Sequence, residues 1–187
     1  RQVIPSIIAK TQKELEQLLL KVEDFSEIIH LDVMDGIFVE NHSLDFNFAL
    51  PNTSCRFEAH LMMVNPLDWI MVHGDKVETI LIHYEIEGDQ SSLISLVKKS
   101  GKKIGLVLNP EIPVENIKKY LDKIDRVLVM MVNPGRYGAE FLPEMLDKVK
   151  ELRNLNPGLD IEVDGGISKK TIEIASAAGA NLFVSGS

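Results

Sequence analysis

The sequence predicts an α/β protein with a single domain, a closed (β/α)8 or TIM barrel in which eight parallel strands alternate with helices. The main observation is that eight short apolar segments alternate with longer amphipathic segments along the 187 residues. Their nearly even spacing favours a closed barrel over an open, doubly wound sheet. Neither a GxGxxG motif after the first strand nor a GxxxxGK[ST] motif occurs, so the dinucleotide-binding and P-loop folds lack their main signature.

The expected strands are short runs rich in Val, Ile and Leu, as strands buried on both faces of a parallel sheet should be. They are Val3–Ile8, Ile28–Met34, Phe57–Met62, Thr79–His83, Ile104–Leu108, Arg126–Val132, Ile161–Asp164 and Leu182–Ser185.

Amphipathic segments between these strands predict the helices. They are Thr11–Val22, Pro66–Val72, Ser92–Ser100, Val114–Leu121, Pro143–Leu152 and Lys169–Ala178. The segment Ile37–Pro51 is irregular and predicts a long loop with a short helix near its end. No helical pattern follows the eighth strand, so we expect one barrel domain over residues 1–187 that is incomplete at its C-terminal end.

The charge balance narrows the classes of partner. The chain has 20 Lys and Arg against 28 Asp and Glu, a net charge of −8. Such a field repels nucleic acids and anionic membranes, whereas a small phosphorylated ligand needs only a local pocket. Cys55 is the one cysteine, which excludes an intrachain disulfide framework and favours a reducing, cytoplasmic location. The longest apolar stretches, such as Val127–Val132, are too short to span a bilayer.

Polar residues within the buried strands indicate where the chemistry lies. His30 and Asp32 share one face of the second strand, His60 lies in the third, and Asp164 ends the seventh. The carboxyl ends of barrel strands meet at one mouth, so we expect these four side chains to converge there. Two imidazoles and two carboxylates suit a divalent cation, and burying both carboxylates without partners would be costly.

Other residues of these strands are expected to have structural or supporting roles. Glu162 lies two residues before the end of the seventh strand, which predicts a structural carboxylate paired inside the barrel. His83 ends the fourth strand and is expected to lie behind the candidate ligands. Met34, Met62 and Met130 suit ordinary core packing.

Glycine-rich turns follow the last three strands. Asn133–Gly138 follows the sixth strand, Gly165 and Gly166 the seventh, and Gly186 the eighth. Glycine lets backbone N–H groups approach an anion closely, and barrels of this kind hold phosphate after their last strands. Three such turns predict a small phosphorylated substrate.

These motifs resemble the ribulose-phosphate 3-epimerase family. The strings that carry the resemblance are His30–Val39, His60–Met62, Val132–Gly135 and Val163–Gly166, and Pro5–Ile7 and Ser185–Ser187 agree with it. It implies a (β/α)8 barrel that interconverts ribulose 5-phosphate and xylulose 5-phosphate in the pentose phosphate pathway. It also implies one divalent cation, zinc or iron(II) first and manganese or cobalt next. We expect a homo-oligomer without a nucleic-acid or membrane partner.

The resemblance further implies residue roles. His30, Asp32, His60 and Asp164 would bind the metal, and Asp32 and Asp164 would be the acid/base pair. The implied substrate-binding residues are Ser6, His60, Met34, Met62, Met130, Gly135, Gly138, Gly166, Gly186 and Ser187. Inverting C3 of a 2-ketose requires a base on one face and an acid on the other. A metal would stabilise the negative charge of the enediolate between them.

Departures from the family pattern leave other activities open. Glu40 stands where the family usually has proline, and residues 42–50 lack its usual glycine-proline pair. An epimerase of a phosphorylated hexulose, such as allulose 6-phosphate, is therefore an alternative. Arg136 and Tyr137 replace the usual Phe-Gly of the phosphate loop. A phosphate-binding lyase or decarboxylase would share the glycine turns without needing the histidine pair, and a non-catalytic phosphosugar-binding barrel is the third class.

Overall fold

Eight parallel strands form the barrel in a computed structural model that describes residues 1–134 and 139–186. They are β1 (Gln2–Ile7), β2 (Ile28–Asp35), β4 (Arg56–Met62), β5 (Thr79–His83), β6 (Lys103–Leu108), β7 (Arg126–Met130), β8 (Asp160–Asp164) and β9 (Leu182–Ser185). Each overlaps one predicted strand, and the boundaries agree to within two residues.

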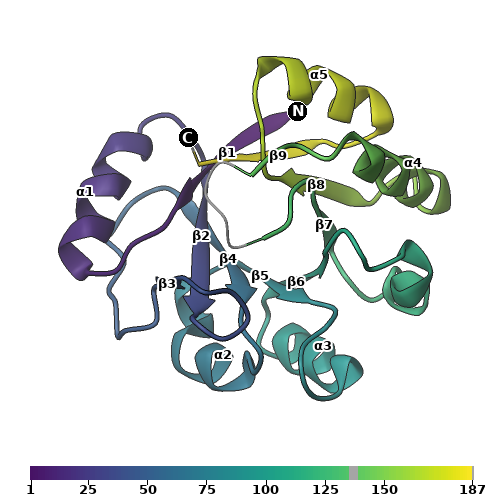
Figure 1. Cartoon of the computed structure of the whole chain (residues 1–187). Coiled ribbons are helices and arrows are strands. Elements are labelled where there is room, and N and C mark those ends of the chain that lie inside the picture. The colour runs from purple at the N-terminus through teal and green to yellow at the C-terminus, as the bar shows by residue number, and fades with distance from the viewer. Residues whose placement is uncertain (135–138, 187) are drawn as a thin grey trace.

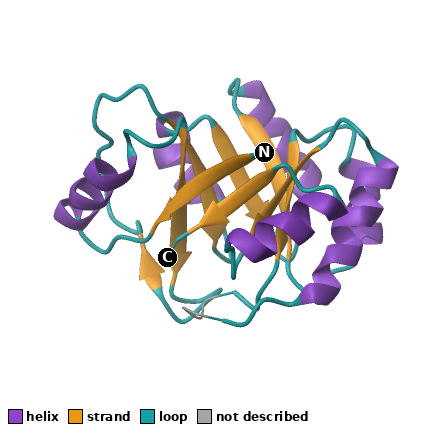
Figure 2. Cartoon of the chain, turned by 90° about the horizontal axis from the view of Figure 1, so that it is seen from above, coloured by secondary structure: helices purple, strands orange, loops and turns teal. Residues whose placement is uncertain are grey.

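These strands close into a barrel, which confirms the predicted (β/α)8 TIM fold. Neighbours follow the order β1-β2-β4-β5-β6-β7-β8-β9, and β9 pairs with β1 to complete the ring. Figure 1 shows this ring with the helices outside it, and Figure 2 shows the strands running side by side between the helices. Because the strands are parallel, their carboxyl ends meet at one mouth of the barrel.

Helical segments connect the strands on the outside of the barrel. They are α1 (Gln12–Val22), α2 (Leu67–His73), η1 (Gly74–Lys76), α3 (Gln90–Lys99), η2 (Val114–Tyr120), η3 (Pro143–Met145), α4 (Leu146–Leu155) and α5 (Lys169–Ala178), where η marks a 3-10 helix. α3 begins two residues before the predicted start, because Asp89 accepts hydrogen bonds from the N–H groups of Ser91 and Ser92. Within the described ranges, none of the helices is both long and apolar enough to cross a membrane.

The predicted short helix near the end of residues 37–51 is wrong, because this loop contains no helix. It instead contains β3 (His42–Ser43), which pairs antiparallel with the end of β2. The side chain of Gln12 bonds both the N–H and the C=O of Ala49, at 3.0 and 3.1 Å. The backbone groups that a helix would use are therefore satisfied by a side chain of α1.

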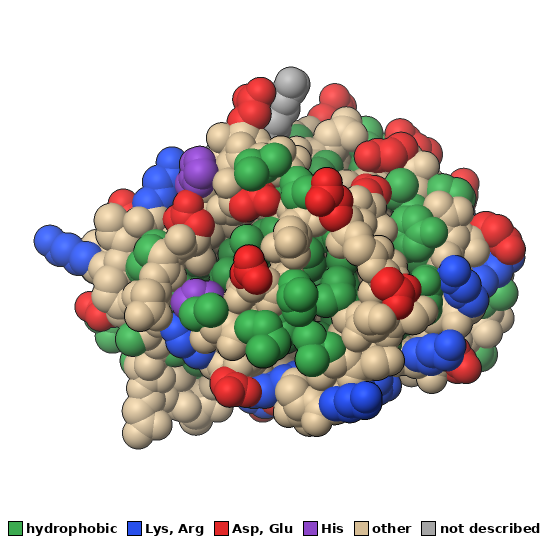
Figure 3. Space-filling view, turned by 90° about the horizontal axis from the view of Figure 1, so that it is seen from below, with side chains coloured by type: hydrophobic (Ala, Val, Ile, Leu, Met, Phe, Trp, Pro, Cys, Tyr) green, Lys and Arg blue, Asp and Glu red, His purple; other side chains and the backbone are tan. Residues whose placement is uncertain are grey.

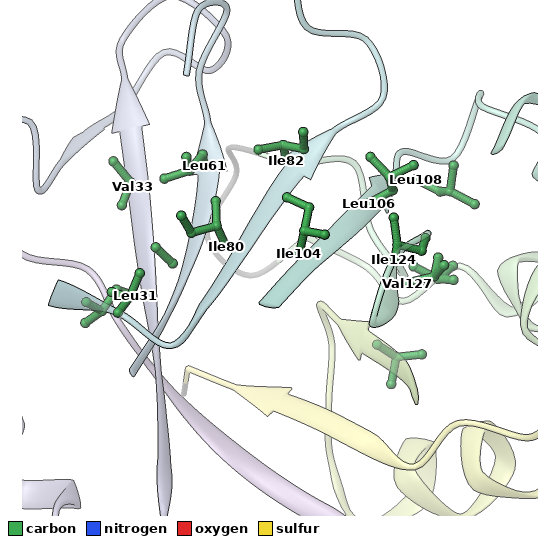
Figure 4. Packing of buried hydrophobic residues seen from close by; sticks show 14 of the residues in the cluster. Leu31, Val33, Leu61, Ile80, Ile82, Ile104, Leu106, Leu108, Ile124 and Val127 are labelled. Atoms are coloured by element: carbon green, nitrogen blue, oxygen red, sulfur yellow. The ribbon is translucent and has the colours of Figure 1, made fainter. Parts of the chain in front are cut away.

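The hydrophobic core lies between the sheet and the helices. Figure 4 shows part of it, with labelled side chains from neighbouring strands and from the segment before β7: Leu31, Val33, Leu61, Ile80, Ile82, Ile104, Leu106, Leu108, Ile124 and Val127. Successive side chains of a strand point to opposite faces. Since Leu31 and Val33 of β2 pack outward, His30, Asp32 and Met34 point into the barrel.

The outer surface mixes acidic, basic and apolar side chains. Figure 3 shows the molecule from below, with hydrophobic side chains gathered near the centre and charged ones around them. On α2, Met71 and Val72 are 68% and 65% exposed. The face seen in Figure 3 carries acidic and basic side chains together and has no uniform basic patch of the kind that attracts a phosphate polymer.

Candidate active site

A cavity of about 390 Å³ opens at the mouth of the barrel. Its lining includes eight residues that the sequence predicted for the site: Ser6, Asp32, Met34, Met62, Met130, Asp164, Gly166 and Gly186. Sequence reasoning misses Ile8 and Asn41, which also line it, because an aliphatic residue and a loop amide carry no signal of their own. The volume and the largely apolar wall suit a small molecule.

Four ionisable side chains converge beside this cavity. His30 and Asp32 come from β2, His60 from β4 and Asp164 from β8, and one donor atom of each lies within 4.8 Å of the others. Asp32 Oδ1 lies 3.3 Å from His30 Nε2 and 3.2 Å from His60 Nδ1. His60 Nδ1 lies 3.9 Å from Asp164 Oδ2. Strand register explains part of this geometry, because Asp32 and His60 are direct partners in the β2–β4 pairing.

The donor atoms of this group fit a divalent cation. His30 Nε2 is buried, and among the residues that the structure describes it has no hydrogen-bond partner. A buried nitrogen without a partner is costly, and a cation between the four donors would satisfy it. Two imidazole nitrogens with two carboxylate oxygens suit zinc or iron(II). His30, Asp32, His60 and Asp164 could therefore hold a metal ion.

Hydrogen bonds behind the two histidines turn their remaining nitrogens toward Asp32. His30 Nδ1 lies 2.7 Å from Glu58 Oε1. Because a carboxylate only accepts, Nδ1 donates, and the neutral form of the ring therefore has its lone pair on Nε2. His60 Nε2 lies 2.8 Å from His83 Nε2, which leaves Nδ1 of His60 facing the other donors. His83 thus lies directly behind a candidate ligand, where the end of the fourth strand was expected to place it.

Three further charged side chains fill the barrel interior next to His30. Arg126 Nη1 contacts Glu58 Oε2 and lies 2.7 Å from Glu162 Oε2. The prediction that Glu162 is paired inside the barrel is confirmed. Glu58 could have been found from the sequence, because it is in phase with His60 along its strand. Arg126 could not, because an arginine that opens a strand normally reaches solvent.

The surroundings shift the pKa values of these groups in opposite directions. Burial raises the pKa of Asp32, but the charge of His30 and the close imidazoles of His30 and His60 outweigh burial and hold it well below its usual value. Burial and the charge of Asp32 raise the pKa of Asp164 to about 7. Burial lowers the pKa of His30, but the charge of Asp32 and hydrogen bonds to three carboxylates raise it well above normal. The two aspartates therefore differ in protonation near neutral pH.

We expect metal affinity to fall as the pH drops below about 7. Asp164, with a pKa of about 7, and His30, with a raised pKa, must both lose protons before they can bind a cation. Each proton that the metal displaces weakens binding by about tenfold per pH unit below that pKa. Calorimetric zinc titrations between about pH 6 and pH 8, in buffers of different ionisation enthalpy, count the protons released. An affinity independent of pH over this range would contradict the expectation.

Two glycine turns shape the side of the cavity where phosphate is expected. Gly165 and Gly166 have φ values of +102° and +63°, which disfavour other residues. A Cβ at Gly165 would lie 2.4 Å from a methyl group of Val132, and one at Gly186 would lie 2.5 Å from Ser6 Oγ. Backbone N–H groups at such turns can approach an anion closely. The other phosphate-binding predictions, Gly135, Gly138 and Ser187, lie outside the described residues.

The loop after β2 is tied in place by Asp35. Its Oδ1 accepts hydrogen bonds from the N–H groups of Ile37 and Phe38, both at 2.8 Å, and its Oδ2 accepts one from Val64 at 2.9 Å. Burial raises the pKa of Asp35, but these hydrogen bonds outweigh burial and lower it. Because Asn41 of the same loop lines the cavity, Asp35 connects the cavity wall to the segment after β4.

Comparison with solved structures supports the fold. The chain superposes on 3-hexulose-6-phosphate synthase with a TM-score of 0.70 at 14% identity, covering 100% of this chain and 90% of the other. A mutant tryptophan synthase α-subunit from Pyrococcus furiosus gives a TM-score of 0.74 at 18% identity, covering 99% and 86%. The fold and the site together define a (β/α)8-barrel enzyme with its centre at the carboxyl ends of the strands.

Sequence comparison identifies the family. The sequence model of the ribulose-phosphate 3 epimerase family matches residues 2–187. The chain belongs to the ribulose-phosphate 3-epimerase family, a family of isomerases, as its motifs predicted. It is 37% identical to the ribulose-phosphate 3-epimerase of Schizosaccharomyces pombe over 99% of this chain and 85% of that protein. It is 37% identical to the ribulose-phosphate 3-epimerase of Bacillus subtilis over 100% and 90%.

Proposed function

We propose that this protein inverts C3 of D-ribulose 5-phosphate and so interconverts it with D-xylulose 5-phosphate. One observation carries the proposal: Asp32 and Asp164 line the same cavity, and their pKa values are shifted in opposite directions. Inversion next to a carbonyl needs a base and an acid, and surroundings that separate two carboxyl pKa values are typical of such a pair. Family membership supports the choice of substrate.

The two aspartates divide the reaction between the two faces of C3. In one direction Asp32, the ionised carboxylate, takes the proton from C3, and the electron pair moves toward the C2 carbonyl oxygen to give an enediolate. Asp164 then gives its proton to the opposite face of C3, and the configuration is inverted. In the reverse direction the two carboxyl groups exchange roles.

The remaining cavity residues orient the sugar and keep water away. Met34, Met62 and Met130 are almost fully buried and present thioethers to the cavity. Thioethers donate no proton, so these three side chains do not compete with the positioned carboxyl groups in protonating the intermediate. We assign Ser6 to the sugar hydroxyls. The phosphate is assigned to Gly166 and Gly186, together with Gly135, Gly138 and Ser187.

The metal ligands complete this assignment. We propose that His30, Asp32, His60 and Asp164 hold one zinc or iron(II) ion, with manganese and cobalt as further candidates. The cation supplies positive charge that stabilises the negative charge developing on the substrate oxygens. The chain's own part is to orient both imidazoles, through Glu58 behind His30 and through the histidine behind His60.

The proposed activity is tested by NMR of ribulose 5-phosphate in D2O with the purified protein. We expect deuterium to replace the C3 proton while xylulose 5-phosphate appears, because each turnover exchanges that proton with a carboxyl group. A protein-free sample is the control, and allulose 6-phosphate is run in parallel. Exchange confined to the hexulose would assign the alternative substrate, and no exchange in either sugar would mean a non-catalytic barrel.

We also propose a cytoplasmic location and a homo-oligomeric state. The free thiol of Cys55 suits a reducing compartment, and one relative, from Oryza sativa, is named a cytoplasmic isoform. The exposed apolar side chains of Met71 and Val72 on α2 support contact between copies. Light scattering of the purified protein measures the number of copies.

A further inference from the structure

The barrel interior next to the candidate ligands holds a buried group of charges, which we call the inner charge cluster: Glu58, Arg126 and Glu162. Their exposed fractions are 1%, 5% and 0%, and they come from β4, β7 and β8. Each charged group loses its hydration when buried, and apolar residues of similar volume commonly stabilise such a space better. Stability alone therefore does not explain why this chain keeps three charges there.

The contacts of the inner charge cluster lead to His30. Arg126 Nη1 donates to Glu58 Oε2 and, at 2.7 Å, to Glu162 Oε2. The second oxygen of each carboxylate faces His30 Nδ1, with Glu58 Oε1 at 2.7 Å and Glu162 Oε1 at 3.3 Å. Each carboxylate thus lies between the guanidinium group on one side and the imidazole on the other.

The neighbouring strand makes room for the arginine. Gly105 of β6 is the register partner of Arg126 on β7. A Cβ at Gly105 would lie 2.6 Å from a methyl group of Leu81, 2.9 Å from Arg126 Cγ and 3.0 Å from the Arg126 carbonyl oxygen. The φ of Gly105 is not in the left-handed region, so space rather than conformation calls for glycine here. The strand is therefore built to admit this side chain.

A second metal site is the competing interpretation of the same residues. One donor atom each of His30, Glu58 and Glu162 also lie within 4.8 Å of one another. Arg126, however, bonds to both carboxylates and brings its own positive charge between them. A cation at this point would be repelled by the guanidinium group, so the cluster is a hydrogen-bonded support.

We propose that Arg126 is a positioning residue for the metal centre. By holding Glu58 and Glu162 it fixes Glu58 against His30 Nδ1, and so it directs His30 Nε2 toward the other ligands. A carboxylate that accepts the distal N–H of a ligating histidine fixes the ring and raises its basicity, and losing such support costs about 10–100-fold in metal affinity. This inference rests on the metal centre of the proposed function.

The test compares zinc binding by three variants with that of the parent protein. Arg126→Met keeps the length of the side chain and removes the charge and the hydrogen bonds. Arg126→Lys keeps the charge but cannot reproduce the planar, branched donor group. Arg56→Met is the matched control, because within the described part of the chain Arg56 makes ion pairs only with Glu27 and Glu78, at 3.4 and 3.7 Å, and all three side chains are at least partly exposed. The measurements are the zinc dissociation constant by chelator competition, the visible spectrum of the cobalt(II) form, and the melting temperature of the metal-free protein.

We expect Arg126→Met to bind zinc about 10–100-fold more weakly than the parent and to shift the cobalt(II) spectrum. The zinc affinity of Arg126→Lys should lie between those of Arg126→Met and the parent, and the zinc affinity of Arg56→Met should match that of the parent. If Arg126→Met does not fold, the weakened affinity and altered spectrum of Arg126→Lys carry the result. Parental zinc affinity and cobalt(II) spectrum in the folded Arg126 variants, even with a lowered melting temperature, would show a merely structural arginine and overturn the proposal.

The outcome separates this inference from the proposed function. If the parent exchanges the C3 proton and the Arg126 variants bind zinc as tightly as it does, the positioning role fails while the epimerase activity stands. If the parent binds zinc but exchanges no proton, the activity fails while the affinities still decide the role of Arg126. A parent protein that binds no metal overturns the positioning role outright.

Discussion

Replacing Asp164 with Asn is expected to lower the rate of net epimerisation by about two to four orders of magnitude, the loss typical of one general acid or base. Asp32→Asn is expected to do the same, because inversion needs a working carboxyl group on each face of C3. Each substitution also removes a candidate metal ligand, so the loss grows where the metal is lost as well. Asp160→Asn, at the exposed start of the same strand as Asp164, is the matched control and should keep the parental rate.

Proton exchange separates the two roles more sharply than the rate does. With metal bound, each variant keeps one working base, so Asp32→Asn should exchange the C3 proton of one epimer only, and Asp164→Asn that of the other. The metal content of both variants has to be measured, since an empty site would stop both exchanges for a different reason. A metal-loaded Asp164→Asn that still produces the epimer at near the parental rate would rule out the two-carboxylate mechanism.

Removing the metal is expected to abolish turnover. Without the cation, the negative charge that develops on the substrate oxygens loses the stabilisation that the metal would supply. A loss of several kcal/mol corresponds to roughly three or more orders of magnitude in rate. Activity and metal content are measured together after dialysis against a chelator, and then after zinc, iron(II), manganese or cobalt is returned. The melting temperature of the chelated protein shows whether the fold survives. Full activity in a preparation without metal would contradict the proposed metal dependence.

The strands and the candidate ligands could be predicted because both depend on a period of two along the chain. Once Leu31 and Val33 face the helices, His30 and Asp32 must face the barrel interior. The ends of parallel strands then bring His60 to the same mouth. This reasoning needs only the alternation of residues along each strand and the parallel direction of the strands. Both can be inferred from one sequence.

The position of Arg126 in the inner charge cluster could not be predicted in the same way, because its burial depends on the register between strands. Arg126 is buried only because Gly105 lies opposite it on β6 and leaves space inside the barrel. No local pattern shows which residue of one strand faces which residue of the next. The helix expected within residues 37–51 was wrong for a related reason, since Gln12, distant in sequence, bonds the backbone of that loop.

The pairing of β1 with β9 has a consequence for how the protein is made. It joins the first strand to the last, with Gln2 opposite Leu182. The ribosome releases β1 early, and that strand has one unpaired edge until β9 emerges. Contacts between residues so far apart form late, because the loop between them must close first.

The candidate ligands are therefore assembled in two stages during synthesis. β2 and β4 are close in sequence and pair directly, so His30, Asp32 and His60 can come together while much of the chain is still unmade. Asp164 arrives only with β8, and Gly186 meets Ser6 only when the ring closes. A nascent chain thus has three of its four candidate metal donors before it has the second carboxyl group. Under the proposed function, it would be able to capture a cation before it could invert a sugar.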